Sequence, residues 1–331
     1  MTKDIYRNSL FENSSRLKKT RWVIFDEIHY LDDLERGTVW EEAIMFTPSS
    51  IKILGLSATV PNIQEMVDWI ENIHEEKIHT IIESKRPVPL THLFQCQGKI
   101  FKNSDTLKKE GYHNRMEWRF SWKEKRQMNL AHFHVKPNRL DSLVHHLQEN
   151  DRLPAIYFTF ARRRTEELAF ELSHFNFLNP EEKIQITALF QNLCQRFDLI
   201  AENSAKEMLP LIERGIAFHH AGMLPTLKET IEQLFTSRLI KLIFTTETFA
   251  LGINMPARSV IFDELRKFYG THFANLRTRD FYQMAGRAGR RGIDTEGYVY
   301  SRLNPSYISF SEVVRILNSN PERVKSQFNT S

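Results

Sequence analysis

Short apolar runs recur along the chain and alternate with amphipathic stretches. Several runs, such as the one at residues 22–25 (WVIF), carry no polar residue at every second position, which is typical of strands covered on both faces. We expect strands at Trp22–Phe25, Ile51–Leu56, Ile78–Ile82, Ala155–Phe160, Ile216–His219, Lys241–Thr245, Ser259–Asp263 and Tyr298–Ser301. Alternation of such strands with helices predicts α/β domains with parallel sheets.

Helical spacing appears in the segments that begin at Arg162 and at Leu224, and Pro225 suits the first turn of the second. Residues 180–213 are predicted to form a helical insert. The stretch 97–126 changes character, because it is polar, lysine-rich and aromatic. We interpret it as an insertion or linker between domains, and a solvated surface loop accounts for it better than a specific site.

Composition sets the class of protein. A chain of 331 residues, 41% apolar and 26% charged, suggests two ordinary globular domains. No run approaches the roughly 18 apolar residues of a membrane helix, and the first residues lack a signal-peptide core. Cys96 and Cys194 lie far apart, which favours a reducing compartment over a zinc site or a disulfide framework. The net charge of +4 permits nucleic-acid binding without requiring it.

The first candidate for chemistry follows the apolar run at residues 22–25. That run ends in Asp26-Glu27, with His29 close behind. A carboxylate at a strand tip can hold a divalent ion on nucleotide phosphates, usually through water. A second carboxylate can orient and deprotonate an attacking water. An acidic pair that opens a helix would look the same, so the rest of the chain must decide between the two interpretations.

The stretch FYQMAGRAGRRG, residues 281–292, is the most informative of the other candidates. It contains Gln283, Arg287, Arg290 and Arg291. Arginines three residues apart on a short helix would face one direction and could neutralise a transferring phosphoryl group. The interleaved glycines weaken a helix and disfavour a plain basic surface helix.

Two further strand ends carry short polar groups. The predicted strand at residues 241–245 runs into Thr246-Glu247-Thr248, whose hydroxyl and N–H groups can hold a sugar-phosphate backbone. Gly252 and Asn254 then permit a tight approach of the backbone. Another strand ends in the pair at residues 219–220 (HH), where adjacent histidines point apart, so a nucleic-acid contact is favoured over a metal site.

Four stretches of the chain together resemble a known family. DEIH, SAT, TETFALGINMPA and QMAGRAGRRG, in this order and spacing, resemble motifs II, III, V and VI of superfamily-two helicases. The histidine of DEIH makes the chain similar to DExH-box proteins. The segments FDEIHYLDDLERGTVWEEAI, HHAGMLPTLKE and RKFYGTHFANLRTRDFYQMAGRAGRRG resemble the superkiller-type (Ski-like) branch, whose members mostly unwind RNA. The resemblance covers nearly the whole chain, except the stretch near 97–130 and the helical segment after Leu178.

The resemblance implies an α/β fold with two RecA-like parallel-sheet domains, the first of them incomplete. We expect the first domain at residues 1–96, an insertion or linker at 97–133 and the second domain at 134–303. Residues 304–331 would begin a connection toward a winged-helix domain.

It also implies roles for individual residues. Asp26 would hold Mg²⁺ through water, and Glu27 would be the catalytic base. The remaining ATP-hydrolysis residues would be Gln283, Arg287 and Arg290, which would reach the γ-phosphate of ATP from the second domain. Coupling of hydrolysis to nucleic-acid binding would fall to His29, Ser57 and Thr59. The nucleotide-binding residues would be Gly252 and Asn254. The nucleic-acid contacts would come from Thr159, Phe160, Arg162, His220, Gly222, Thr246 and Thr248.

The sequence contains no phosphate loop, the motif that normally accompanies a DExH strand. A phosphate loop has the form G-x-x-x-x-G-K-[ST], and the one Gly-Lys pair, Gly98-Lys99, has neither the earlier glycine nor the following hydroxyl residue. In the resembling family the loop precedes the DExH strand, and residues 1–11 resemble a segment that follows the loop. We therefore expect a chain cut at both ends, with little ATP hydrolysis of its own.

The expected function is an ATP-dependent helicase core that unwinds RNA, with ATP and Mg²⁺ as cofactors. It would act inside the cell, in the cytoplasm, or in the nucleus if the source is eukaryotic. Its substrate would be single-stranded RNA or a 3′-tailed duplex, with DNA as a possible alternative. Two other interpretations stay open. One is a non-catalytic nucleic-acid-binding or regulatory fragment, which the absent phosphate loop favours. The other is a DNA helicase of the same superfamily.

Overall fold

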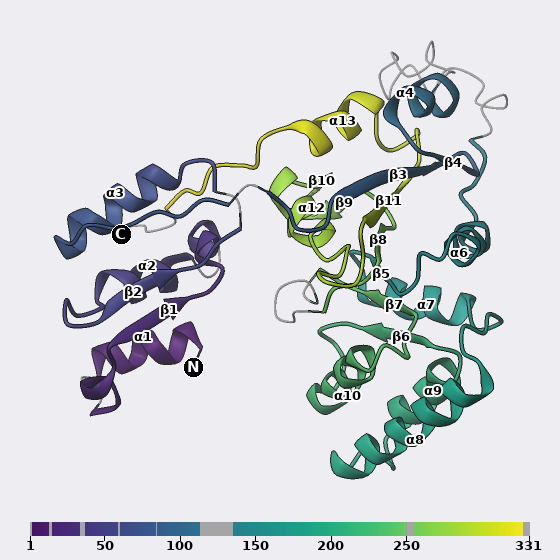
Figure 1. Cartoon of the computed structure of the whole chain (residues 1–331), viewed down its shortest axis with the longest axis horizontal. Coiled ribbons are helices and arrows are strands. Elements are labelled where there is room, and N and C mark those ends of the chain that lie inside the picture. Colours follow the sequence, from purple (N-terminus) through teal and green to yellow (C-terminus); the bar gives the residue numbers. More distant parts are fainter. Residues whose placement is uncertain are drawn as a thin grey trace. The chain divides into compact units, whose positions relative to one another are not determined.

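The computed structural model describes residues 2–12, 15–33, 37–58, 60–83, 85–112, 135–247, 249 and 255–326. The chain divides into two compact units. Unit 1 comprises Met1–Lys85, Arg277–Arg279 and Ser319–Ser331, and unit 2 comprises Arg86–Leu276 and Asp280–Asn318. Mixed helices and mainly parallel strands confirm the expected α/β class (Figure 1).

Unit 1 is built around two parallel strands. Its elements are α1 (Lys3–Phe11), η1 (Ser15–Lys19), β1 (Trp22–Phe25), η2 (Ile28–Asp32), α2 (Gly37–Met45), β2 (Lys52–Gly55) and α3 (Ile63–His74). Strands β1 and β2 pair in parallel from Trp22 opposite Lys52 to Phe25 opposite Gly55. One core joins the strands to the helices, and it contains Tyr6 of α1, Phe25 of β1, Ile44 of α2 and Ile70 of α3.

Unit 2 is built around a seven-stranded sheet in the order β4-β3-β11-β8-β5-β7-β6. Its strands are β3 (Leu90–Cys96), β4 (Lys99–Phe101), β5 (Ala155–Phe158), β6 (Ile216–His219), β7 (Leu242–Thr245), β8 (Ser259–Phe262) and β11 (Gly297–Leu303). Only the pairing of β4 with β3 is antiparallel among the described strands of this sheet. Every residue of β5, β6, β7 and β8 is buried, as the apolar runs predict.

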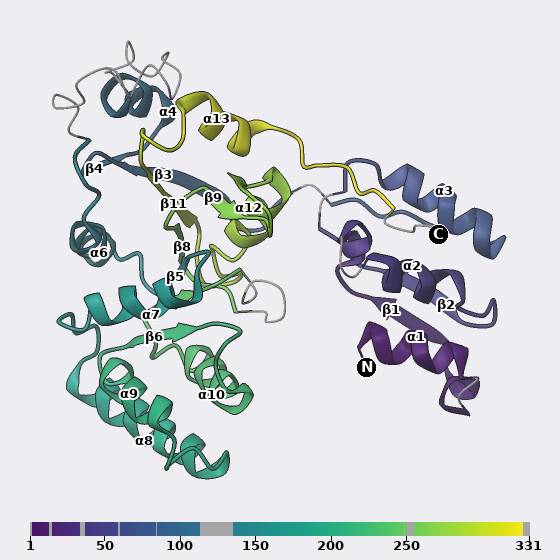
Figure 2. The same ribbon diagram turned by 180° about the vertical axis from the view of Figure 1, so that it is seen from behind.

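Helices and one hairpin surround this sheet. They are α4 (Ser104–Thr106), the π-helical η3 (Leu107–Gly111), α6 (Leu140–Glu149), α7 (Arg162–Glu171), α8 (Pro180–Arg196), α9 (Asn203–Ile212), α10 (Pro225–Thr236), β9 (Arg266–Phe268), β10 (Phe273–Asn275), α12 (Thr278–Ala285) and α13 (Phe310–Asn318). Thr278 and Arg279, at the start of α12, belong to unit 1. Helices α8 and α9 lie side by side near β6 in both views (Figures 1 and 2), which confirms the helical insert at 180–213. Pro225 opens α10 as expected.

The expected strand at Ile78–Ile82 is wrong. These residues form no strand, and the side chains of Ile81 and Ile82 are 93% and 74% exposed. Isoleucine favours a strand only where a neighbouring strand can pair with it and cover it. No described strand pairs with this segment.

The division of the chain also differs from the expected one, because unit 2 begins at Arg86 rather than after residue 96. Leu90–Cys96 form β3, which pairs with β11 in the large sheet, and Lys99–Phe101 form β4 within the stretch interpreted as a linker. Gln97 and Gly98 turn the chain between them, with φ of 51° and 76°. Positive φ at both central residues is typical of a two-residue hairpin. The Gly98-Lys99 pair therefore belongs to a β-hairpin.

Within the described part of the chain, no helix is long and apolar enough to cross a membrane. Both cysteines, Cys96 and Cys194, are buried and unbridged.

Candidate functional site

In unit 1, the carboxyl end of β1 places Asp26 and Glu27 in a tight turn. Leu56 donates its N–H to the Phe25 carbonyl at 2.8 Å, and Ile28 donates to the Leu56 carbonyl at 2.9 Å. These two bonds pin the turn to the chain that leaves β2. Glu27 has a left-handed backbone, with φ of 59°, which is uncommon for a residue with a long side chain. Asp26 is exposed at the strand tip, so its carboxylate is accessible.

His29 links this turn to the segment after β2. Its side chain is only 1% exposed, and its Nδ1 lies 3.2 Å from Ser57 Oγ and 3.3 Å from Glu27 Oε2. The structure thus brings together two residues expected to couple binding to hydrolysis, together with the expected catalytic base. Thr59, the third coupling residue, lies outside the described residues.

In unit 2, three neighbouring strands end side by side. Thr159 follows β5 and donates its N–H to the Thr245 carbonyl of β7 at 2.8 Å. Thr245 Oγ1 donates to the His219 carbonyl of β6 at 2.9 Å, and the Thr246 N–H donates to the same carbonyl at 3.4 Å. Because parallel strands end at one edge of a sheet, the expected nucleic-acid contacts of three motifs converge there.

His220 shapes the loop after β6. Its Nδ1 accepts a hydrogen bond from the Gly222 N–H at 3.1 Å, so Nε2 carries the proton that is shared with Glu166 at 2.8 Å. A Cβ on Gly222 would lie 3.2 Å from His220 Nδ1 and 3.5 Å from Arg162 Cδ. The loop is therefore closely packed against both side chains, and Arg162 at the start of α7 is exposed beside it.

His219 points the other way, as expected for adjacent histidines on a strand. Its Nε2 lies 2.8 Å from Glu232 Oε1 of α10. Burial lowers the pKa of His219 to about 4, helped by the nearby Lys228 charge. The buried ring of His219 is thus neutral near neutral pH.

Phe160, at the same edge of the sheet, is half-buried.

Gln283 lies on α12 and is half-buried, but the arginines of this motif do not share its helix. Helix α12 ends at Ala285, so Arg287 and Arg290 lie in the loop that follows, contrary to the expected helical spacing. Gly289 and Gly292, in this loop, take φ of 83° and 77°, values that favour glycine. The Gly289 N–H donates to the Ala257 carbonyl at 2.8 Å, which docks the loop on the chain before β8.

Two residues that the sequence reasoning missed hold this arginine loop. Asp294 binds Arg290 through Nε and Nη2, both at 2.7 Å, and through the backbone N–H at 2.8 Å. Burial alone would raise the pKa of Asp294, but its hydrogen bonds with Arg290 and the charge of Arg258 lower it. A spacing of four indicates an ion pair only within a helix, and residues 290–294 form none, so this pair could not be predicted from the sequence.

Arg86 is the second missed residue. Its Nη2 donates to the carbonyls of Gly286 and Ala288 at 2.9 and 2.6 Å, and its Nε donates to Val88 at 2.7 Å. The two loop carbonyls flank Arg287, so Arg86 fixes the backbone on both sides of that residue. Nothing in the local sequence marked it, because these bonds join residues some 200 positions apart.

The residues present fit a magnesium ion bound mainly by phosphates. No group of three or more His, Cys, Asp or Glu side chains that could hold a metal occurs in the described ranges. An accessible strand-tip carboxylate such as Asp26 is the kind of ligand that Mg²⁺ takes alongside nucleotide phosphates. Gly252, Asn254 and Thr248 lie outside the described residues.

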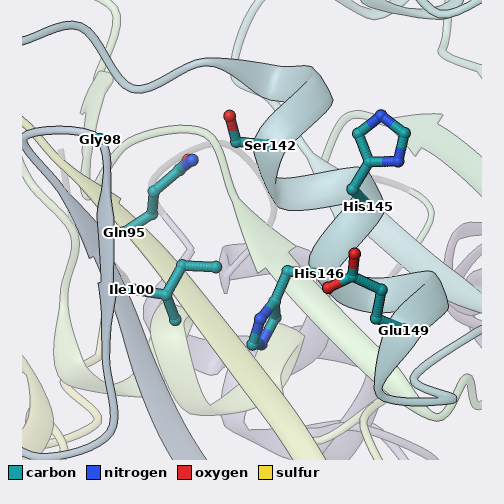
Figure 3. A pocket seen from close by; sticks show the side chains of 7 residues that line it. All are labelled: Gln95, Gly98, Ile100, Ser142, His145, His146 and Glu149. Atoms are coloured by element: carbon teal, nitrogen blue, oxygen red, sulfur yellow. The ribbon is translucent and has the colours of Figure 1, made fainter.

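A separate open groove in unit 2, of about 670 Å³, contains none of the expected site residues (Figure 3). It is lined by Gln95, Gly98, Ile100, Ser142, His145, His146 and Glu149. Burial lowers the pKa of His146, together with the charge of Arg152. The groove lies between the β3–β4 hairpin and α6.

Comparison with known proteins gives one family match in the first part of the chain and another in the second part. A family model described as DEAD/DEAH box helicase matches residues 1–66, and one described as helicase conserved C-terminal domain matches residues 177–292. Superkiller complex protein 2 of Homo sapiens is 37% identical over 355 residues, covering 99% of this chain and 28% of that protein. Exosome RNA helicase MTR4 of Homo sapiens is 38% identical over 318 residues, covering 90% of this chain and 30% of that protein.

ATP-dependent RNA helicase mtr4 of Schizosaccharomyces pombe is 35% identical over 321 residues, covering 90% of this chain and 28% of that protein. The chain thus spans less than a third of the length of these relatives. The two family matches imply two RecA-like domains, which agrees with the parallel sheets of both units. On its motifs, fold and relatives, the chain belongs to the superkiller-type DExH-box helicases of superfamily two.

Proposed function

We propose that the chain is part of an ATP-dependent helicase core that binds RNA, and that the whole protein couples ATP hydrolysis to RNA unwinding inside the cell. The convergence of three strand ends in unit 2 carries this proposal. There the loops that follow β5, β6 and β7, at Thr159, His220 and Thr246, converge beside the exposed, cationic Arg162. A cationic side chain beside polar loops suits phosphate and sugar contacts, which position a strand without reading its sequence.

RNA would lie along this edge, as a single strand or the tail of a 3′-tailed duplex. We assign the contacts to Thr159, Phe160, Arg162, His220, Gly222, Thr246 and Thr248. Both ring nitrogens of His220 are already used, one by Gly222 and the other by Glu166. Its part is to hold the Gly222 N–H in a fixed loop. Arg162 would supply the charge that a phosphate needs.

ATP would be handled by the other motifs. Asp26 would hold Mg²⁺ through water, and the ion would neutralise charge on the phosphates. Glu27 would accept the proton of the attacking water, with the buried His29 fixing its carboxylate through the 3.3 Å contact. Gly252 and Asn254 would lie on the nucleotide side.

Charge on the transferring phosphoryl group would be met by Gln283, Arg287 and Arg290. Arg290 has five N–H donors and uses two of them on Asp294, so others can serve a phosphate. Arg86 would keep Arg287 in place through the carbonyls on either side of it. His29, Ser57 and Thr59 would couple this step to RNA binding.

No G-x-x-x-x-G-K-[ST] sequence occurs in the 331 residues. Such a loop binds the β- and γ-phosphates through its lysine and its backbone N–H groups. Without it, these phosphates are bound more weakly. We therefore expect this chain alone to bind RNA while hydrolysing ATP negligibly.

Two neighbouring arginines offer a matched test of the RNA edge. Arg162 packs beside Gly222, whereas Arg163 is 90% exposed and pairs with Glu167 at 2.8 Å. The measurement is the fluorescence anisotropy of a labelled single-stranded RNA, titrated with the chain at several salt concentrations. Arg162→Gln should weaken binding by about 3- to 10-fold and reduce the slope of log K against log salt by about 0.7.

Arg163→Gln should change affinity by less than about twofold, since a solvated cation outside the contact adds only a screened charge. A single-stranded DNA of the same sequence tests the DNA alternative. Equal loss in both arginine variants, or wild-type binding that does not respond to salt, would refute the proposed edge.

A further inference from the structure

A lysine on the β9–β10 hairpin lies between two carboxylates from different motifs. Lys267 Nζ is 2.6 Å from Glu247 Oε2 and 3.1 Å from Asp280 Oδ2. The lysine side chain is only 13% exposed, and Nζ also lies 4.6 Å from the centre of the Tyr269 ring. The Tyr269 hydroxyl donates to Asp280 Oδ2 at 3.2 Å, so Lys267, Tyr269 and Asp280 all contact one another. We call Glu247, Lys267, Tyr269 and Asp280 the lysine cluster.

The two carboxylates come from segments with different proposed tasks. Glu247 follows directly on Thr246, which we assign to the RNA edge. Asp280 lies in the first turn of α12, one helical turn before Gln283, which we assign to the ATP side. All four members of the lysine cluster belong to unit 2.

Lys267 is the shared counter-ion of the two carboxylates in the lysine cluster. Glu247 and Asp280 are 41% and 20% exposed, so part of their hydration is lost, and one ammonium serves both. Without it, two partly buried carboxylates would lose their common counter-ion and their shared donor. The position of Glu247 relative to Asp280 is thus set through Lys267.

From this geometry we infer that Lys267 is a positioning residue that makes α12 respond to RNA bound beside Thr246. The inference rests on the proposed function. RNA bound to Thr246 would restrain Glu247, Glu247 would restrain the ammonium, and the ammonium would restrain Asp280 at the start of α12. Lys267 itself would touch neither RNA nor ATP.

Hydrogen exchange measured with and without a single-stranded RNA of about 20 nucleotides tests the inference on the chain as it is. In the wild type, RNA should slow exchange in the α12 amides by roughly tenfold, because bound ligand restricts local opening. In Lys267→Met, RNA affinity should stay within about threefold while the slowing at α12 falls below about twofold. Lys267→Arg should restore most of the response, since it keeps a cation with several donors.

Lys241→Met is the matched control. Lys241 also forms a partly buried ion pair in unit 2, with Glu182 at 2.8 Å, but neither partner belongs to the proposed sites. It should leave the RNA response of α12 unchanged. Glu247→Gln and Asp280→Asn keep the lysine and guard against misfolding of the methionine variant. Each should reduce the RNA-induced slowing of hydrogen exchange at α12 by about twofold or more.

The outcomes separate the two proposals. A wild type that binds no RNA refutes the proposed function. A wild type that binds RNA without slowing exchange at α12 refutes only the role of the lysine cluster. The same holds if Lys267→Met keeps the full response, if Lys241→Met loses it as well, or if both carboxylate variants leave it intact.

Discussion

The two sheets carry similar apolar runs but bury them differently. In β5 of unit 2, all four residues of AIYF are buried. In β1 of unit 1, the run WVIF leaves Trp22 57% and Ile24 61% exposed, and only Phe25 is buried. On β2, Leu54 opposite Ile24 is 42% exposed. One face of the small sheet therefore carries apolar side chains that no described residue buries.

The difference teaches that an apolar run specifies a strand and not the layers around it. Both strands form where the sequence places them, because backbone pairing with a neighbour suffices. Burial needs further elements on each face. The polar turns at the strand ends are less sensitive to this, since hydrogen bonds with neighbouring turns fix them in both units.

The sharpest way to break the comparison is to shorten the same residue type in each strand. Ile156→Ala in β5 should lower the free energy of unfolding by about 2–5 kcal/mol, because it leaves a cavity in a fully buried layer. Ile24→Ala in β1 should change it by less than about 0.5 kcal/mol. Urea unfolding followed by circular dichroism measures both. Equal losses would mean that the exposed face of β1 is covered in solution.

The next largest effect concerns how each unit holds its functional turn. Unit 2 uses a buried ion pair, since the side chain of Asp294 is 4% and that of Arg290 15% exposed. Asp294→Asn should cost about 1–3 kcal/mol in the same unfolding experiment, because the arginine loses a charged partner away from water. Asp141→Asn, at a 53% exposed position, is the control and should cost less than about 0.5 kcal/mol. A matching loss in the control would show that the pair adds nothing specific.

The same ion pair predicts a pH dependence. The pKa of Asp294 in the folded state lies below its ordinary value of 3.8. Its stabilising effect is therefore fully present above that value and is lost as the pH falls through the lower folded-state pKa. The stability gap between wild type and Asp294→Asn should stay constant from pH 7 to about 5 and shrink below about 4. A gap that widens on acidification would contradict the assigned direction.

The smallest effect is expected in unit 1, where the hydrogen bond between Ser57 and His29 joins two uncharged groups. Ser57→Ala removes the 3.2 Å contact with His29 Nδ1, but Ser57 is exposed and water can replace it. The loss should be about 0.5 kcal/mol or less. Ser50→Ala, at an exposed turn position, should have no measurable effect. A loss above about 2 kcal/mol for Ser57→Ala would show that unit 1 relies on this bond as unit 2 relies on Asp294.

Much of the fold could be predicted because its information is local. Apolar runs located β1, β5, β6, β7 and β8, and Pro225 located the start of α10. Two misses came from non-local pairing. The Ile78–Ile82 run looks like a strand but has no described neighbour to pair with. Residues 90–96 were expected in the first domain and residues 97–101 in the linker, but they form β3 and β4, which pair with each other, and β3 pairs with β11.

The candidate site divides in the same way. Asp26, Glu27, Thr159, His220 and Arg287 stand out because their motifs are continuous in sequence. Arg86 could not be predicted, because its bonds reach across about 200 residues to the carbonyls beside Arg287. The contacts of Lys267 could not be predicted from the sequence either, because they depend on where the fold places Glu247 and Asp280.

The most direct test of the account is ATP hydrolysis by the purified chain with and without single-stranded RNA, beside Glu27→Gln. We predict no hydrolysis above background in either protein, while both bind RNA in a salt-dependent manner. That result would separate RNA binding, which this chain retains, from ATP hydrolysis, which needs the G-x-x-x-x-G-K-[ST] loop that these residues lack. Hydrolysis that RNA stimulates and Glu27→Gln abolishes would contradict the account, because another element of this chain would then hold the phosphates.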